Sequence, residues 1–341
     1  MSELSEPLLI THPQPSADWL AASVEPALEP TLPIIDPHHH FSEHWGGYRV
    51  PELLHDIDAG HAIEATVYIQ CGSYYRESGP EAMKPVGETE TVVAMAEQSV
   101  KARPTPRIAA GIVGYADLKI GEAIDEVLAA HVAAGKGRFR GIRNSGARHE
   151  AFKHGVLPRP MPKLYADASF RRGYACLARH QLSFDAWIYH PQMDEVIDLA
   201  RAFPEIPLIL DHAGVLAVGP FKGRRHESVR DWLPTMKTLA ACPNVNVKLG
   251  GLGTAVFGYD FPTHAAAPSS QLLADTWRPI MEPVIEMFGP ARCMFESNFP
   301  VDRAAAGYSV VWNAFKRIAA GASPADKALL FHDTAARVYR L

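Results

Sequence analysis

The chain has few cysteines and no excess of positive charge. Its 341 residues include four cysteines, and no two of them form a Cys-x-x-Cys pair, which argues against a zinc knuckle and a disulfide framework. The formal net charge of -5 provides neither a basic surface for nucleic acid nor a polybasic membrane anchor. We therefore expect reduced thiols and no nucleic-acid or membrane partner.

Long apolar runs and a targeting signal are also missing. No stretch approaches the roughly 20 apolar residues that a membrane-spanning helix requires, and the N-terminus has acidic residues where a signal peptide has basic ones. These absences predict a cytoplasmic protein. Hydrophobic residues nevertheless make up 47% of the chain and charged residues 21%, which suits an enzyme with a large core.

Strand-like and helix-like stretches alternate eight times from residue 32 onward. This pattern predicts an α/β fold, a single (β/α)8 TIM barrel over residues 32–341, because right-handed crossovers let a parallel sheet wrap until it closes. A doubly wound open sheet is the structural alternative. The predicted strands are 34–41, 64–71, 107–115, 138–144, 182–189, 207–212, 244–250 and 292–298. The predicted helices are 51–59, 90–102, 121–134, 166–180, 193–203, 228–241, 272–288 and 308–320.

Two additions to the barrel are expected at its ends. Residues 1–31 are rich in proline and acids, so they predict an N-terminal arm with one helical turn near Trp19. Such an arm packs over the barrel or reaches a neighbouring subunit, which makes a homodimer possible. An extra C-terminal helix is predicted over 324–339.

The first predicted strand ends in a run of histidines. In Asp36-Pro-His-His-His40, the alternation of side chains along a strand directs Asp36, His38 and His40 to one face and His39 to the other. Two imidazoles at this spacing on one face form half of a metal site.

Further polar residues lie at the ends of other predicted strands. Because these ends share one face of a barrel, the four histidines are expected to converge where neutral imidazoles bind a divalent ion. The two cations either contact an anionic substrate or pair with buried acids. The residues at the later strand ends are Arg143, His190, His212, Lys248, Glu296 and Asn298.

These motifs resemble those of the amidohydrolase superfamily. The similarity is to the amidohydrolase-related branch that includes sugar lactonases, 2-pyrone-4,6-dicarboxylate lactonase and sulfomuconolactone hydrolase. It implies that His38, His40 and His190 hold a divalent metal such as zinc, and that His212 polarises the substrate carbonyl or activates water. The motifs are Asp36-Pro-His-His-His40, Val86-Gly-Glu-Thr-Glu90, Gly141-Ile-Arg143, His190-Pro-Gln192, Leu210-Asp-His-Ala-Gly214 and Met294-Phe-Glu-Ser-Asn-Phe-Pro300.

One position departs from the pattern of that superfamily. Asn298 stands where an aspartate usually accepts a proton from the attacking water, and an uncharged amide cannot act as a base. Glu296, Asp302 or His212 could supply the base, and we favour Glu296 because the strand period directs it to the same centre. Without the anionic ligand, the site would bind zinc more weakly.

The resemblance implies hydrolysis of a lactone or similar cyclic ester of a small, carboxylate-bearing substrate. We expect Arg143 to hold the carboxylate, because its guanidinium fork suits that group. Tyr74, Tyr75 or Arg76 would help, with Lys248 nearby. The loop over 72–89 is either a candidate lid over the site or an ordinary surface loop. The alternatives are a metal-dependent decarboxylase of an aromatic acid, and a non-catalytic barrel that binds a small ligand.

Overall fold

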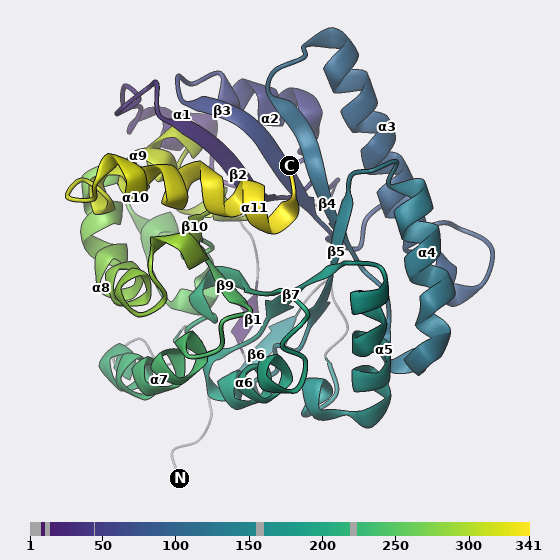
Figure 1. The fold of residues 1–341 in the computed structure, drawn as a ribbon. Helices are drawn as coiled ribbons and strands as arrows, with labels where there is room; N and C mark the ends of the chain where they lie inside the picture. The colour runs from purple at the N-terminus through teal and green to yellow at the C-terminus, as the bar shows by residue number, and fades with distance from the viewer. Residues whose placement is uncertain (1–7, 11–13, 44, 155–159, 219–223) are drawn as a thin grey trace.

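Eight parallel strands form the centre of the molecule (Figure 1). The computed structural model describes residues 8–10, 14–43, 45–154, 160–218 and 224–341. The strands pair in the order β2-β3-β4-β5-β7-β8-β9-β10, which confirms the predicted barrel. Their bounds are β2 Pro33–His39, β3 Ala62–Ile69, β4 Arg107–Gly114, β5 Phe139–Ser145, β7 Ser183–Trp187, β8 Leu208–Leu210, β9 Val245–Leu249 and β10 Cys293–Phe295.

The barrel closes between the end of β2 and the segment that follows β10. His39 forms an isolated parallel bridge with Phe299, and the backbone N–H of Asn298 donates to the carbonyl of His38 at 2.9 Å. The Asp36 carboxylate reinforces this junction, since it accepts hydrogen bonds from the backbone and hydroxyl of Ser297 at 3.0 and 2.6 Å. The histidines of β2 are thereby fixed beside the end of β10.

Helices follow the strands and cover the outside of the barrel (Figure 1). Local sequence sets where several of them begin: Asp167 caps α5 through Phe170 N–H, and Ser269 caps α8 through Leu272 N–H. The bounds are α2 Val50–Ile57, α3 Val86–Ala102, α4 Ile124–Ala134, α5 Ala168–Arg179, α6 Met193–Ala202, α7 Arg225–Ala240, α8 Ser270–Phe288 and α9 Tyr308–Ile318.

The C-terminal segment fills the barrel from the end at which the strands begin. The predicted final helix is divided into α10 (Pro324–Ala328), a π-helical turn (Leu329–Asp333) and α11 (Thr334–Tyr339). α11 packs its Val338 and Tyr339 among interior side chains of the strands, such as Ile35. Figure 1 shows α11 crossing one end of the barrel, so the polar site must open at the other end.

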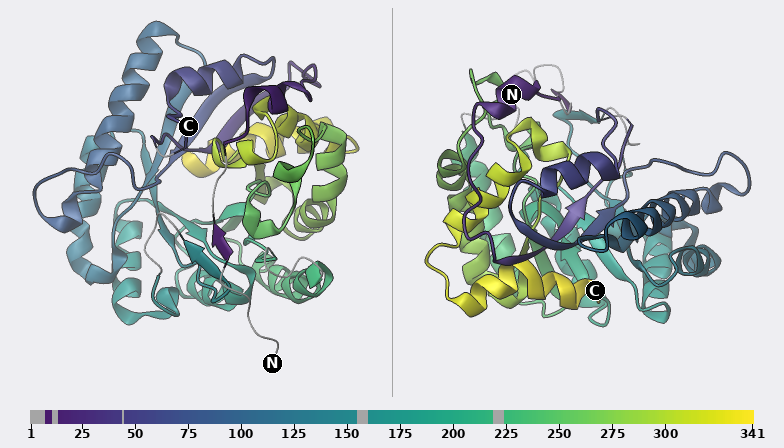
Figure 2. Two further views of the ribbon diagram at one scale, coloured as in Figure 1. Left: turned by 180° about the vertical axis from the view of Figure 1, so that it is seen from behind. Right: turned by 90° about the horizontal axis from the view of Figure 1, so that it is seen from above.

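The N-terminal arm begins at the opposite end of the barrel from α11 and runs back along the barrel to α10, where Glu29 pairs with Lys327 at 2.9 Å (Figure 2). Its strand β1 (Leu8–Ile10) pairs in parallel with β6 (Phe152–His154), which belongs to the loop after β5. The expected helical turn is α1 (Ala17–Ala21). The side chain of Trp19 then donates to the carbonyl of His264 at 2.9 Å, so β1 and α1 join loops on the side where the strands end.

The described helices contain no segment that is both long enough and apolar enough to cross a lipid bilayer.

Candidate active site

His38 and His40 lie at the end of β2 with their ring nitrogens facing each other. Their Nε2 atoms are 3.2 Å apart, and both side chains are almost completely buried. His39 points away, as the strand period predicts, and its Nε2 lies 2.9 Å from the hydroxyl of Thr66 on β3. The structure therefore brings together the two histidines expected to share one face.

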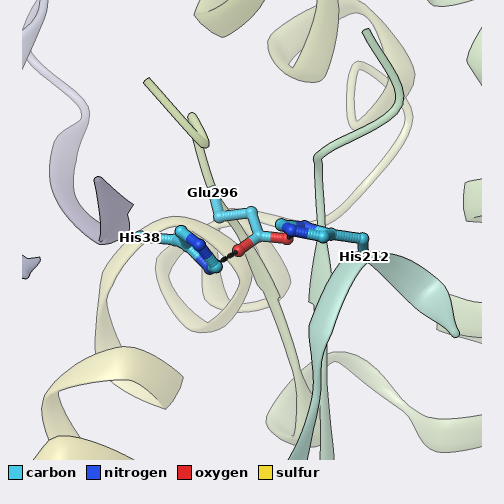
Figure 3. A group of neighbouring side chains, drawn as sticks. All are labelled: His38, His212 and Glu296. Atoms are coloured by element: carbon cyan, nitrogen blue, oxygen red, sulfur yellow. Dashed lines mark hydrogen bonds and ion pairs between the residues drawn. The ribbon is translucent and has the colours of Figure 1, made fainter. Parts of the chain in front are cut away.

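Glu296 connects His38 with a third imidazole. It follows β10 and is fully buried; its Oε2 lies 2.7 Å from Nδ1 of His38 and its Oε1 lies 2.6 Å from Nδ1 of His212 (Figure 3). His212 comes from the turn after β8. One carboxylate thus fixes two rings that are more than 170 positions apart in the chain.

The ring of His40 has a hydrogen-bond acceptor that assigns its proton. Nδ1 of His40 lies 2.7 Å from the carbonyl oxygen of Ile69, so Nδ1 carries the proton and Nε2 presents a lone pair. Nδ1 of His38 lies between the Glu296 carboxylate, at 2.7 Å, and the Lys248 ammonium, at 3.2 Å. Burial lowers the pKa of both imidazoles well below the usual value, so both are neutral at pH 7.

This arrangement fits a metal ion. The two Nε2 atoms, 3.2 Å apart, have nearly the separation expected for nitrogens that each lie roughly 2.0–2.1 Å from one zinc ion. The partners on the other nitrogens, a carboxylate and a backbone carbonyl, are those that commonly orient metal-binding histidines. Among the described residues, His38, His212 and Glu296 also form a group of metal-binding type with donor atoms within 4.8 Å of one another.

Both predicted cations reach the site. Nζ of Lys248 lies 2.7 Å from Asp185, 3.3 Å from Asp211 and 3.2 Å from Nδ1 of His38. A terminal nitrogen of Arg143 lies 3.4 Å from Nε2 of His38. The carboxylates of this cluster therefore offset the charge of Lys248. Burial would lower the pKa of Lys248, but Asp185 and Asp211 raise it above the usual value. Lys248 is therefore buried and protonated.

His212 has an unusual backbone and an unusual proton affinity. Its φ is +54°, and Ala213 and Gly214 are also left-handed, a conformation that is disfavoured for residues with a Cβ and that often marks functional sites. Burial would lower the pKa of His212, but the Glu296 carboxylate outweighs it and raises the pKa above the usual value. The ring is therefore held in place and binds a proton readily.

Asn298 does not point its amide at the histidine pair. Its Nδ2 donates to Oδ1 of Asp302 at 2.9 Å, and the other oxygen of Asp302 accepts from Gly253 N–H at 3.1 Å. Burial raises the pKa of Asp302 to about 7. The carboxylate of Asp302 thus lies directly behind the amide that replaces the usual aspartate.

Three predicted site residues lie outside this cluster in the structure. His190 lines a separate cavity of about 190 Å³ with His149 and Asp231, and its Nδ1 accepts the N–H of Ala217 at 3.0 Å. In the predicted lid loop, Arg76 forms an exposed ion pair with Glu90, and the hydroxyl of Tyr74 lies 3.5 Å from Glu43. Their roles in metal or substrate binding stay predictions.

Asp185 and Asp211 were missed by the sequence reasoning, although both contact Lys248. Asp185 is a charge inside an otherwise apolar strand, and Asp211 immediately precedes His212. A buried carboxylate requires a partner, so these two acids could have been matched to the inward-facing lysine. Tyr339, which donates to Asp185 at 2.8 Å, gave no such signal because its helix is remote in sequence.

Comparison with known proteins places this chain in a family. The family model described as "Amidohydrolase" matches residues 35–341. The chain is 35% identical to the uncharacterized protein y4mH of Sinorhizobium fredii over 86% of each chain. It is 27% identical to L-fucono-1,5-lactonase of Burkholderia multivorans over 90% of this chain and 96% of that protein.

A solved structure shows the same fold with a metal. The crystal structure of an amidohydrolase from Burkholderia multivorans with bound zinc is 26% identical to this chain, covers 90% of it and 99% of its own length, and superposes with a TM-score of 0.66. The family match spans almost the whole barrel. The chain therefore belongs to the amidohydrolase family.

Proposed function

We propose that the protein is a hydrolase that opens a lactone, or a similar cyclic ester, of a small carboxylate-bearing substrate. The observation that carries this proposal is the Glu296 carboxylate, which lies between Nδ1 of His38 and Nδ1 of His212. The relatives named L-fucono-1,5-lactonase, at 27% and 28% identity, support a lactone as the substrate class.

His212 is the proposed general base. Its Nδ1–H donates to Glu296, so the lone pair of Nε2 is available for a proton of the attacking water. The imidazolium that forms is stabilised by the same carboxylate, as in other acid–histidine pairs. His212 then returns the proton to the ring oxygen as the acyl C–O bond breaks, and the product is a hydroxy acid.

This assignment changes the role first expected for Glu296. Its Oε1 accepts from Nδ1 of His212, and its Oε2 lies 2.7 Å from Nδ1 of His38. The carboxylate therefore sustains the charge on His212 and lies against the ring of His38. Asn298 lacks a basic group and donates to Asp302, so it holds the end of β10 beside His38. Asp302, as a buried acid behind Asn298, is the alternative proton acceptor.

We propose that Nε2 of His38 and Nε2 of His40 would hold a divalent ion, zinc. When bound, such an ion supplies positive charge that polarises a carbonyl and lowers the pKa of water. Glu296 and the Ile69 carbonyl fix the orientation of these two rings. His190 would join them only if the loop after β7 moved its ring out of the separate cavity.

Arg143 is the proposed contact for the substrate carboxylate. One terminal nitrogen donates to the carbonyl of Gln70, and the other lies 3.7 Å from Asp211, which is too long for a hydrogen bond. The remaining N–H groups of the guanidinium are the proposed donors to an anion. Arg143 lies beside His38 and is slightly exposed, at 8%, which places it at the border between the buried cluster and solvent.

A panel of aldonolactones and pyrone carboxylates, followed by acid release, tests the proposal. We expect turnover by the wild-type protein, a loss of about 100-fold or more in kcat for His212→Asn, and wild-type rates for the surface control His226→Gln. No turnover of any lactone would contradict the proposal, and release of carbon dioxide from an aromatic acid would favour the decarboxylase instead.

A further inference from the structure

Tyr339, close to the C-terminus, reaches into the interior of the barrel. It is the last residue of α11, and its side chain is fully buried. The hydroxyl donates to Oδ2 of Asp185 at 2.8 Å. Because α11 enters from the end at which the strands begin, this contact approaches the candidate active site from the side opposite the substrate.

Asp185 links Tyr339 to His38 through Lys248. The same Oδ2 accepts from Nζ of Lys248 at 2.7 Å, and Nζ lies 3.2 Å from Nδ1 of His38. The ammonium also lies 5.4 Å from the centre of the Tyr339 ring, within the range of a cation–π interaction. A hydroxyl, a carboxylate, an ammonium and an imidazole therefore follow one another without solvent between them.

Few hydrogen-bond donors other than the Tyr339 hydroxyl hold the Asp185 carboxylate. Asp185 is fully buried, and its Oδ1 has no hydrogen-bond partner among the described residues. Burial already raises the pKa of Asp185 to about 6. Since Tyr339 and Lys248 are the donors to Oδ2, loss of the hydroxyl leaves Lys248 as the single donor that holds this carboxylate in the described structure.

We propose that Tyr339 is a positioning residue of the active site, which holds Asp185 and, through Asp185 and Lys248, the ring of His38. The chain end then contributes to the site without touching the substrate. The inference rests on the proposed function for its kinetic consequence, but its structural consequence can be measured without a substrate.

Tyr339→Phe removes the hydroxyl and keeps the buried ring. We expect kcat for a lactone to fall about 10-fold, as is common for residues that orient a site indirectly, with KM within about twofold of wild type. Tyr48→Phe is the matched control, because Tyr48 is equally buried and donates at 2.8 Å to another acid, Asp56. The control should keep the wild-type kcat.

A double mutant tests whether Tyr339 acts through Asp185. In the Asp185→Asn background, Tyr339→Phe should change kcat by less than about twofold, because the carboxylate that it positions is already gone. A wild-type kcat for Tyr339→Phe would overturn the inference. Equal losses for Tyr339→Phe and Tyr48→Phe, with a parallel fall in Tm, would also overturn it by indicating general destabilisation.

Nuclear magnetic resonance of histidine ring nitrogens provides the readout that needs no activity. The His38 signals are assigned by their loss in His38→Gln. Tyr339→Phe should shift the Nδ1 signal of His38, whereas Tyr48→Phe should leave it in place. If the wild type opens no lactone, the proposed function fails, but the spectrum still tests the positioning role of Tyr339. A shifted His38 signal in Tyr339→Phe then supports that role, and an unshifted signal overturns it.

Discussion

The side-chain amide of Asn298 donates a hydrogen bond of 2.9 Å to the carboxylate of Asp302. Both residues are buried, with exposed fractions of 2% and 1%, and Asn298 has a left-handed backbone with φ of +53°. An amide suits this position because it donates to the acid behind it. A buried acid one turn later in the chain therefore accepts the hydrogen bond of this amide.

Asn298→Asp should destabilise the protein at high pH. Two buried carboxylates at this distance cannot both ionise easily, so they share a proton with a raised pKa. A raised pKa in the folded state gives stability that is lost as pH rises through that pKa. We expect a loss of about 2 kcal/mol in the free energy of unfolding at pH 8, which shrinks towards pH 5. Urea unfolding at pH 8 and pH 5 measures this loss in the free energy of unfolding, with the neutral variant Asn298→Ser as control. Equal losses for Asn298→Asp at both pH values would contradict the shared proton.

Gly251→Ala should disturb His212 directly. A Cβ on Gly251 would lie 2.2 Å from Nδ1 of His212, and the residue has φ of +71°. We expect about 3 kcal/mol of destabilisation from overpacking and backbone strain together, with a large fall in kcat. Gly79→Ala is the control, because its φ is +97° but a Cβ there meets no atom within 4 Å. It should lose only about 1 kcal/mol and retain activity.

His61 should make the protein sensitive to mild acid. Burial, with Lys316 beside the ring, lowers the pKa of His61 to about 4, whereas the unfolded chain has a value of about 6.5. The unfolded state then binds more protons between these values, so stability present above pH 6.5 is lost as the pH falls towards 4. Urea unfolding from pH 7 to 4 should show a shallower decline for His61→Gln. An identical slope would contradict this assignment.

Metal analysis should separate the two histidines of β2 from His190. We expect zinc to bind the wild-type protein and to bind at least about 10-fold more weakly in His38→Gln and in His40→Gln. His190→Gln should retain wild-type affinity, because that ring lies in a different cavity and accepts from Ala217 N–H. A matching loss in His190→Gln, measured by calorimetry, would show instead that His190 is a ligand.

Much of the barrel could be predicted from the sequence because each unit is encoded locally. Apolar strand-like runs alternate with helical spacing, and all eight strands expected from this pattern are present. The convergence of four histidines was also predicted, since strand ends share one face of a barrel. The structure brings His38, His40 and His212 together beside Glu296 and leaves His190 outside. The alternation within Pro33–His39 correctly separated His39 from its two neighbours.

Other features depend on contacts between segments remote in sequence. Nothing near Tyr339 indicates that α11 enters the barrel to reach Asp185, and the π-helical turn before it has no clear sequence signal. The pairing of β1 with β6 joins residues 8–10 to residues 152–154, and short strands of this kind lack periodicity. The direction of the His190 ring depends on the turn after Tyr189, which strand alternation does not describe.

The most direct test of the account is the lactonase rate of Glu296→Gln. A glutamine side chain is uncharged, so the positive charge that forms on His212 loses its counter-ion. We expect a loss of about 100-fold or more in kcat in a folded protein, while the surface control Glu97→Gln keeps the wild-type rate. A wild-type rate for Glu296→Gln would contradict the central claim that this carboxylate organises the two imidazoles for catalysis.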